Sequence, residues 1–189
     1  VDGAGDLLVE DYRPAAPASD KPADGAIAAA GITGRGATLF KWQTNMTLGG
    51  ADNGMVMKGA VQMVHAPMNR PRDERVRLTC RMLEASMQNA GGITGFGDGS
   101  RKSAEPNFKS IKASGDVRVD QNKRHIACDF LKYTDDTQTI VLWANPPHRA
   151  TVTVDGEPNP LSADALKWNL AKDRFEAIGL DGGGIPIGR

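Results

Sequence analysis

This chain of 189 residues has no excess of charge of either sign, because its 23 basic side chains balance its 23 acidic ones. Proteins that bind nucleic acids or anionic membranes through electrostatics normally carry a basic excess. We therefore expect no nucleic-acid partner.

Long apolar runs are absent too, since none approaches the roughly 20 residues that a membrane-spanning helix requires. The chain begins at Val1 without a cationic and then apolar signal segment, which suits a mature or trimmed chain.

Residue patterns that carry catalysis or bind metals are scarce. The three histidines show no zinc-ligand spacing, and each adjoins a turn or strand end, so we expect solvated side chains at His65, His125 and His148. No Gly-x-Ser-x-Gly nucleophile motif occurs. The glycine-rich stretch 91–103 lacks the spacing of a phosphate-binding loop. The sequence thus predicts no catalytic residue, no metal site and no cofactor, and we expect a protein that is not an enzyme.

Composition divides the chain into a tail and a domain. Residues 12–30 are dominated by Ala, Pro, Asp and Lys and lack apolar periodicity. We therefore expect residues 1–34 to form a flexible Ala/Pro-rich tail or linker, either a disordered arm or a functional tether. A β domain is expected over residues 35–180, with an insertion near 90–108, and a Gly-rich tail over 181–189.

From residue 36 onward, apolar and polar residues alternate with a period of two, which is typical of half-buried strands. The clearest runs are 55–63, 113–119 and 150–154. Clusters of Gly, Asn, Asp and Pro between such runs indicate turns. Long helical periodicity is absent, so the pattern predicts an all-β fold.

A short motif recurs along the domain. Ile126–Tyr133 aligns without gaps to Leu161–Trp168 and to Leu78–Ala85, and Arg35–Trp42 is a weaker copy. The shared pattern is apolar, any, small, polar, any, apolar, charged, then aromatic or small. A second element, which places a glycine before an alternating run, occurs at 57–63 and at 113–119. A strand–turn–strand unit of this kind cannot bury its apolar face alone, so we expect the units to stack as a β-roll or elongated jelly roll.

The repeat also predicts which apolar side chains face inward. They either fill a plain packed core or line a lipid groove, and both interpretations stay open: Val61, Met63, Leu78, Leu83, Val117, Val119, Ile126, Leu131, Ile140, Leu142, Leu161 and Leu166. Methionines gather in the first half of the chain at positions 46, 55, 57, 63, 82 and 87. Their adaptable thioethers suit an irregular apolar ligand, and they equally fill core gaps.

The two cysteines, Cys80 and Cys128, occupy the same small inward position in two copies of the motif. Two cysteines are too few for a disulfide-dense secreted scaffold. They are either small buried apolar residues or a disulfide between adjacent strands, which would require Cα atoms within about 7 Å.

Three successive stretches, Gly115–Val119, Ile126–Tyr133 and Ile140–Ala144, together resemble the OstA-like family. That family includes the periplasmic bridge proteins of lipopolysaccharide transport, which are LptA- and LptC-like. Copies of the motif cover about residues 35 to 180. This chain departs from the usual pattern in the insertion near 90–108, in the cysteines at two small positions and in its zero net charge, which leaves the identity of any lipid open.

The resemblance implies an open-ended β-jellyroll, in which repeated strand pairs stack as a β-roll of two facing sheets. It implies an apolar interior that holds lipid or lipid A-like acyl chains. It also implies homologous β-jellyroll domains as partners, joined through exposed edge strands, and a location in the periplasm or cell envelope. The alternative is a structural or interaction module of a larger envelope or surface protein, with a filled core and no ligand.

Overall fold

The computed structural model describes residues 1–11, 36–49, 54–67, 75–87, 108–170, 172–178 and 184–186. Within them, thirteen strands form one hydrogen-bonded sheet in which every pairing is antiparallel, which confirms the all-β prediction. None of these residues belongs to a helix long and apolar enough to span a membrane. The strands are β1 (Gly5–Asp11), β2 (Gly36–Trp42), β3 (Asn45–Gly49), β4 (Gly54–Pro67), β5 (Val76–Met87), β6 (Phe108–Gln121), β7 (Arg124–Thr134), β8 (Thr139–Trp143), β9 (Ala150–Val154), β10 (Leu161–Ala163), β11 (Ala165–Asn169), β12 (Arg174–Ile178) and β13 (Gly184–Pro186).

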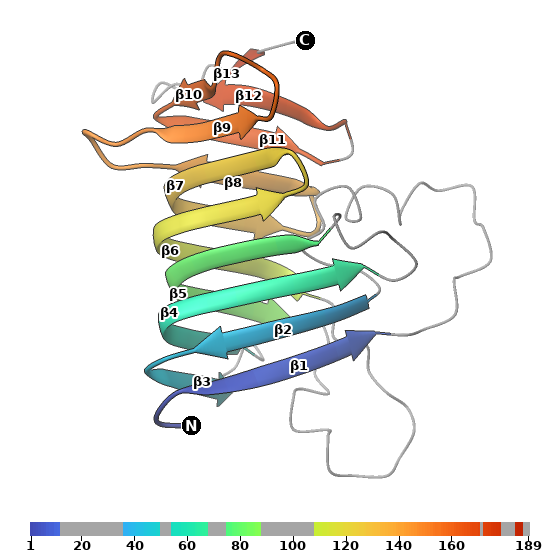
Figure 1. Ribbon diagram of the computed structural model, residues 1–189, viewed down its shortest axis with the longest axis vertical. Helices are drawn as coiled ribbons and strands as arrows, with labels where there is room; N and C mark the ends of the chain where they lie inside the picture. The colour runs from blue at the N-terminus through green and yellow to red at the C-terminus, as the bar shows by residue number, and fades with distance from the viewer. Residues whose placement is uncertain are drawn as a thin grey trace, which may run out of the picture.

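The sheet curls into an unclosed roll, and its strands stack along the long axis from β1 to β13 (Figure 1). The four longest strands, β4 to β7, run through two facing half-sheets. In β7, for example, residues 124–127 pair with β9, whereas residues 130–134 pair with β8. The first half-sheet adds β1, β2, β9 and β10 to these long strands, and the second adds β3, β8 and β11 to β13. We call the side where the long strands pass between the halves the corner, and the opposite side, where strands end in turns, the seam.

Glycines produce the bend at the corner. Gly59 in β4 (φ +80°) and Gly115 in β6 (φ +78°) take left-handed backbone conformations that favour glycine. The pairing register shifts at both positions. An extra residue in one strand bends that strand and increases its twist. The glycine that precedes each alternating run in the sequence therefore lets a long strand turn from one half-sheet into the other.

The repeated motif marks the same corner from the neighbouring strand. Its first, third, sixth and eighth positions are buried in β7, where they are occupied by Ile126, Cys128, Leu131 and Tyr133. The step of three between the third and sixth positions interrupts the period of two at Asp129, where β7 changes its partner from β9 to β8. In the copy at 161–168 the interruption falls at Asp164, which separates β10 from β11.

The weak copy at Arg35–Trp42 does not share this interruption, so its alignment was wrong. Strand β2 alternates without a break, and its corner comes later, at Gln43 and Thr44, whose amide groups donate to carbonyl oxygens of β4. Thr38, which the alignment placed at the polar corner position, is instead buried within the strand.

Two strands lie in stretches that we assigned to the tails. Residues 5–11 form β1 and pair along their whole length with β2, because Leu7 and Val9 pack against the core while the residues between them face outward. The β region therefore starts before the predicted boundary at residue 35. Residues 184–186 form β13 within the expected Gly-rich tail. The rest of the expected N-terminal tail, residues 12–34, and residues 90–107 of the expected insertion lie outside the described residues, and Phe108 already belongs to β6.

Candidate functional site

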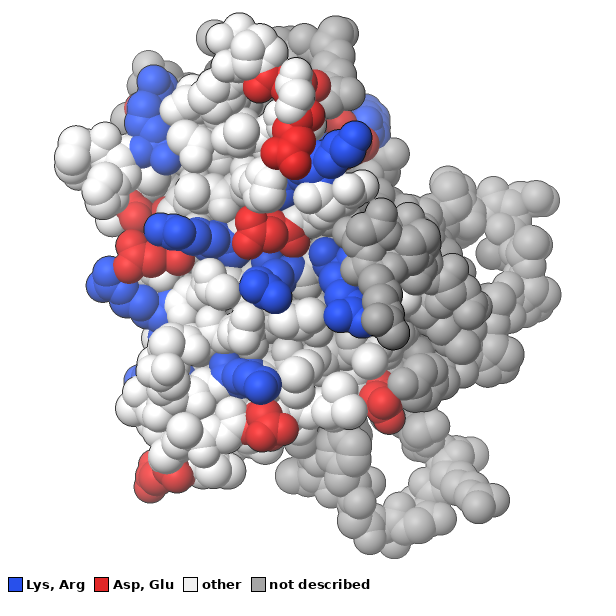
Figure 2. All heavy atoms as spheres, in the orientation of Figure 1, with Lys and Arg blue, Asp and Glu red and all other residues white. Residues whose placement is uncertain are grey.

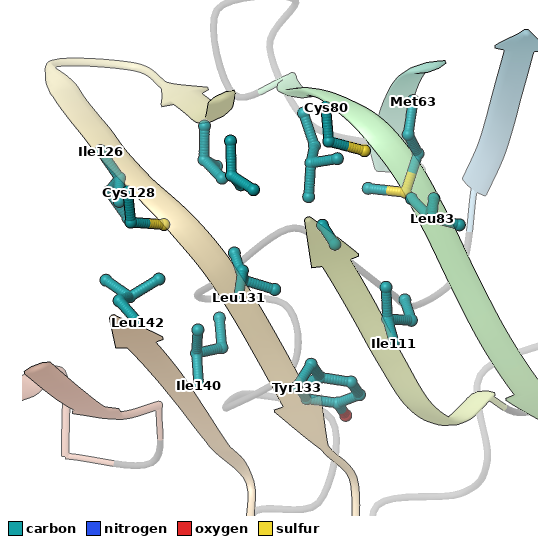
Figure 3. Packing of buried hydrophobic residues seen from close by; sticks show 14 of the residues in the cluster. Met63, Cys80, Leu83, Ile111, Ile126, Cys128, Leu131, Tyr133, Ile140 and Leu142 are labelled. Carbon is teal, nitrogen blue, oxygen red and sulfur yellow. The ribbon is translucent and has the colours of Figure 1, made fainter. Parts of the chain in front are cut away.

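The space between the half-sheets is the strongest candidate site in the described part of the chain. Of the twelve side chains expected to face inward, eleven are buried in one hydrophobic cluster, and Leu161 is half-buried against it. Figure 3 shows side chains of this cluster from neighbouring strands pointing into a common interior, among them Leu83, Ile126 and Leu131. The structure thus places these residues together in one interior.

Cross-strand pairing aligns the interior side chains into continuous apolar rows. One row takes one residue from each strand of the first half-sheet: Leu7, Phe40, Met63, Leu78, Val119, Ile126, Val152 and Leu161. A row in the second half-sheet consists of Met46, Met57, Leu83, Ala113, Leu131, Leu142, Leu166 and Ala177. Neighbouring strands are about 4.8 Å apart, so eight strands give each row a length on the order of 30 Å.

Burial of the rows decreases at the two ends of the roll. Leu7 and Val9 at the β1 end, and Leu161, Phe175 and Ala177 at the other end, are only partly buried against the core. In the middle, water does not reach the side chains: Leu78, Leu83 and Leu142 have 0% exposure. The interior is therefore filled by its own side chains in the middle and is less completely covered at both ends.

Methionines line the part of the interior nearest β1. Met46, Met55, Met57 and Met63 are all buried, with exposures of 0 to 6%. Thioether side chains have many rotamers and adapt to differently shaped neighbours. This segment of the interior is therefore the one best able to change its shape without a large packing penalty.

A polar and aromatic cluster closes the seam near the C-terminal end of the roll. The guanidinium of Arg124, from the first half-sheet, lies 4.6 Å from the ring centre of Trp168 in the second. The carboxylate of Asp173 accepts hydrogen bonds from the Trp168 indole N–H (3.0 Å) and from Arg124 Nη2 (3.2 Å). Phe175 stacks on Trp168 at 5.0 Å. Sequence reasoning missed this cluster, because its members are far apart in the chain and only the fold brings them together.

The outer surface of the corner carries acid–base pairs. Arg81 pairs with Asp116 across β5 and β6. Asp129 accepts a hydrogen bond of 2.7 Å from the backbone N–H of Asn145, which is the main reason that its pKa lies below the usual value. Basic and acidic side chains intermingle over the face shown in Figure 2, in keeping with the balanced net charge.

The histidines differ in environment, and one prediction about them was wrong. His65 is buried at 1% exposure, and its Nδ1 lies 2.8 Å from the Thr38 hydroxyl, because β2 and β4 pair with both side chains facing inward. His125 and His148 are exposed, as expected. His125 contacts Asp120 and Asp155, and these hydrogen bonds and charges raise its pKa.

Cys80 and Cys128 do not form the disulfide that was one of the two expectations. Both are free and buried. Cys80 is in β5 and Cys128 in β7, and β6 lies between these strands. Two strand spacings separate them by about 10 Å, beyond the reach of a disulfide. The thiols occupy the small inward positions as apolar residues.

Within the residues that the structure describes, no group of three or more His, Cys, Asp or Glu side chains could hold a metal ion. The glycine-rich stretch 91–103, which we judged unlike a phosphate-binding loop, lies outside these residues.

Comparison with known proteins gives a likeness of fold. No protein-family profile matches the chain, and no curated protein matches its sequence. Among solved structures, it is similar to LptH of Pseudomonas aeruginosa, described as the LptA-homologous periplasmic component of the lipopolysaccharide transport device. The alignment has a TM-score of 0.53 and 12% identity, and covers 80% of this chain and 89% of that one. The chain therefore has a β-jellyroll fold like that of LptH. At this identity the likeness concerns the fold, and it supports the open-ended architecture that the OstA-like resemblance implied.

Proposed function

We propose that this chain is a non-enzymatic protein of the periplasm or cell envelope that holds acyl chains of a lipopolysaccharide-like lipid between its half-sheets. The observation that carries the proposal is the pair of apolar rows that run from β1 to β10 and from β3 to β12. Rows on the order of 30 Å long are long enough to take the full length of an extended acyl chain. The likeness in fold to a lipopolysaccharide transport component agrees with this role.

An acyl chain would enter by displacing side chains that now fill the interior. The seam is where this costs least, because the half-sheets are joined there by side-chain contacts and not by continuous strands. The methionines near β1 would then repack around the ligand. The partly buried ends let a chain pass between this domain and a homologous β-jellyroll joined to its edge strands.

A structural module with a permanently filled core is the second candidate. The observation that favours it is the complete burial of the middle of the rows, where the described interior has side chains with 0% exposure. In that case the molecule would bind partners through its edges and carry no lipid.

Ala163→Trp distinguishes the two functions. Ala163 is buried in β10 at 8% exposure, next to the corner. If the interior opens for ligand, the added ring occupies ligand space, so binding of a fluorescent fatty acid is lost while the melting temperature is retained. If the core is permanently filled, overpacking typically costs about 1 to 3 kcal/mol and lowers the melting temperature. Ser162→Trp, on the neighbouring residue of the same strand, is the control. Mass spectrometry of lipids that co-purify with the protein tests the same proposal independently.

A further inference from the structure

The seam cluster around Arg124 has features that a purely structural contact does not require. Arg124 presents 20% of its side chain to solvent, and its guanidinium contacts Asp173, Trp168 and Phe175 of the opposite half-sheet. Its Nη2 pairs with Asp173, whereas its buried Nε has no hydrogen-bond partner among the residues that the structure describes. A buried donor without an acceptor costs free energy. The guanidinium therefore has a hydrogen-bond donor left for an anion, and it lies at the seam, where the interior reaches the surface.

The aromatic rings beneath the guanidinium belong to the apolar interior. Trp168 is fully buried and lies beside Ile140 on the neighbouring strand β8. Phe175 stacks on Trp168 at 5.0 Å, also lies 5.5 Å from the Arg124 guanidinium, and is only partly buried. A cation above an aromatic surface that continues into an apolar row is complementary to a molecule with an acid group at one end and a hydrocarbon chain behind it.

Asp173 occupies the place that such an acid group would take. Its carboxylate lies in the turn between β11 and β12, is 56% exposed, and holds Arg124 at 3.2 Å. Ion pairs with this degree of exposure are weak because water competes for both partners. An incoming carboxylate or phosphate can therefore replace Asp173 Oδ2 on Arg124, while Asp173 Oδ1 keeps its hydrogen bond from the Trp168 indole N–H. Guanidinium groups bind both kinds of acid in a two-pronged geometry.

We propose that Arg124 is the acid-group receptor of the lipid site, which exchanges Asp173 for the carboxylate or phosphate of an anionic amphiphile. The inference rests on the proposed function, since it assumes that acyl chains occupy the interior. Arg124 would make the lipid site selective for amphiphiles that carry an acid group. The same exchange loosens the contact between Arg124 and the second half-sheet, so that binding of the acid group and opening of the seam occur together.

The test compares probes with the same hydrocarbon chain and different ends. Dodecanoic acid, dodecyl phosphate and dodecanol compete with a fluorescent fatty acid on the wild-type protein and its variants. A charge-assisted hydrogen bond predicts that wild type prefers each acid to the alcohol by about tenfold. Arg124→Met keeps an apolar stem over Trp168 and should remove this preference, so that neither acid binds more tightly than dodecanol to this variant. Arg124→Lys should retain part of it.

Two further variants make the result specific. Asp173→Asn removes the internal competitor and should raise the affinity for both acids. Arg118→Met removes an exposed arginine from the neighbouring strand β6 and should change nothing. The inference is overturned if Arg124→Met leaves the ratio of acid to alcohol affinity unchanged, or if Asp173→Asn weakens acid binding. If wild type binds the alcohol and both acids equally, the lipid site stands and the acid receptor is rejected. If no probe binds, the proposed function itself is rejected, and this inference with it.

Discussion

Gly59 in β4 lies against Thr44, so that a Cβ atom built on Gly59 would overlap the Thr44 side chain. At this point of the corner the amide of Thr44 also donates to the carbonyl oxygen of Lys58. A left-handed backbone and a close neighbour together explain why glycine stands before the alternating run in β4.

Gly59→Ala should therefore destabilise the fold by more than backbone strain alone. Strain in the left-handed region costs an alanine about 1 to 2 kcal/mol, and the overlap with Thr44 adds to it. Gly156→Ala is the matched control, because Gly156 has φ +85° but no described residue lies within 4 Å of its Cβ position. Denaturation midpoints in urea measure both. Equal losses would show that the corner tolerates a side chain at Gly59.

Thiol chemistry should report the burial of Cys80 and Cys128. Burial raises the pKa of both thiols from 9.0 to about 12. Since the thiolate is the reactive form, both should resist maleimide at pH 8 in the folded protein and react completely in denaturant.

The same pKa shift predicts a dependence of stability on pH. Below pH 9 the thiols are protonated in both states, so their contribution is fully present. As the pH rises from 9 toward 12, only the unfolded chain releases these protons, so stability is lost. The variant with alanine at both positions should lose less stability than wild type between pH 8 and 10.5. Parallel losses in the two proteins would contradict the burial of the thiols.

His125 should titrate above its usual pKa of 6.5, chiefly because of its hydrogen bond to Asp120. Because the folded pKa is the higher one, this contact contributes stability below pH 6.5 and loses it as the pH rises through the folded pKa. Asp120→Asn should shift the pKa of His125 downward in an NMR titration. Asp116→Asn, whose partner is Arg81, should leave it in place. A pKa that is the same in all three proteins would exclude the Asp120 contact in solution.

Self-association should depend on the β1 edge. Within the described residues β1 is the terminal strand of the sheet, where edge-to-edge pairing with another chain can start, and Leu8 on this strand is 52% exposed. Leu8→Lys should reduce concentration-dependent association in sedimentation experiments at little cost in stability. Thr153→Lys adds the same charge to β9, which lies between β7 and β10, and serves as the control. Strictly monomeric wild-type protein at high concentration would contradict this prediction.

The repeat predicted the inward face well, because the interruption in the hydrophobic period is itself a structural signal. The step from Cys128 to Leu131 marks the corner in β7, and Gly59 and Gly115 mark it in β4 and β6. The weak copy was misaligned because β2 has its corner outside the aligned window. The local pattern of apolar and polar residues does not show that β2 ends at a corner formed by Gln43 and Thr44.

Relationships across strands could not be predicted from the same pattern. Cys80 and Cys128 share a position in the motif, yet β6 separates them, because strand order and not motif phase decides which residues meet. His65 was expected in solvent, since its place near a strand end concealed an inward position. Arg124 adjoins Trp168 only through the approach of the two half-sheets at the seam. A single sequence records period and composition, and these contacts depend on topology.

The passage of β4 to β7 through both half-sheets has a mechanical consequence. The strands lie across the long axis of the roll, so the hydrogen bonds between them point along it (Figure 1). End-to-end tension would therefore break these bonds by unzipping, which requires less force than sliding strands past one another. Short strands at the ends, such as β10 and β13, would detach first. To separate two of the four long strands, the ladders of both half-sheets must open at once, so the middle of the roll would be the last part to yield.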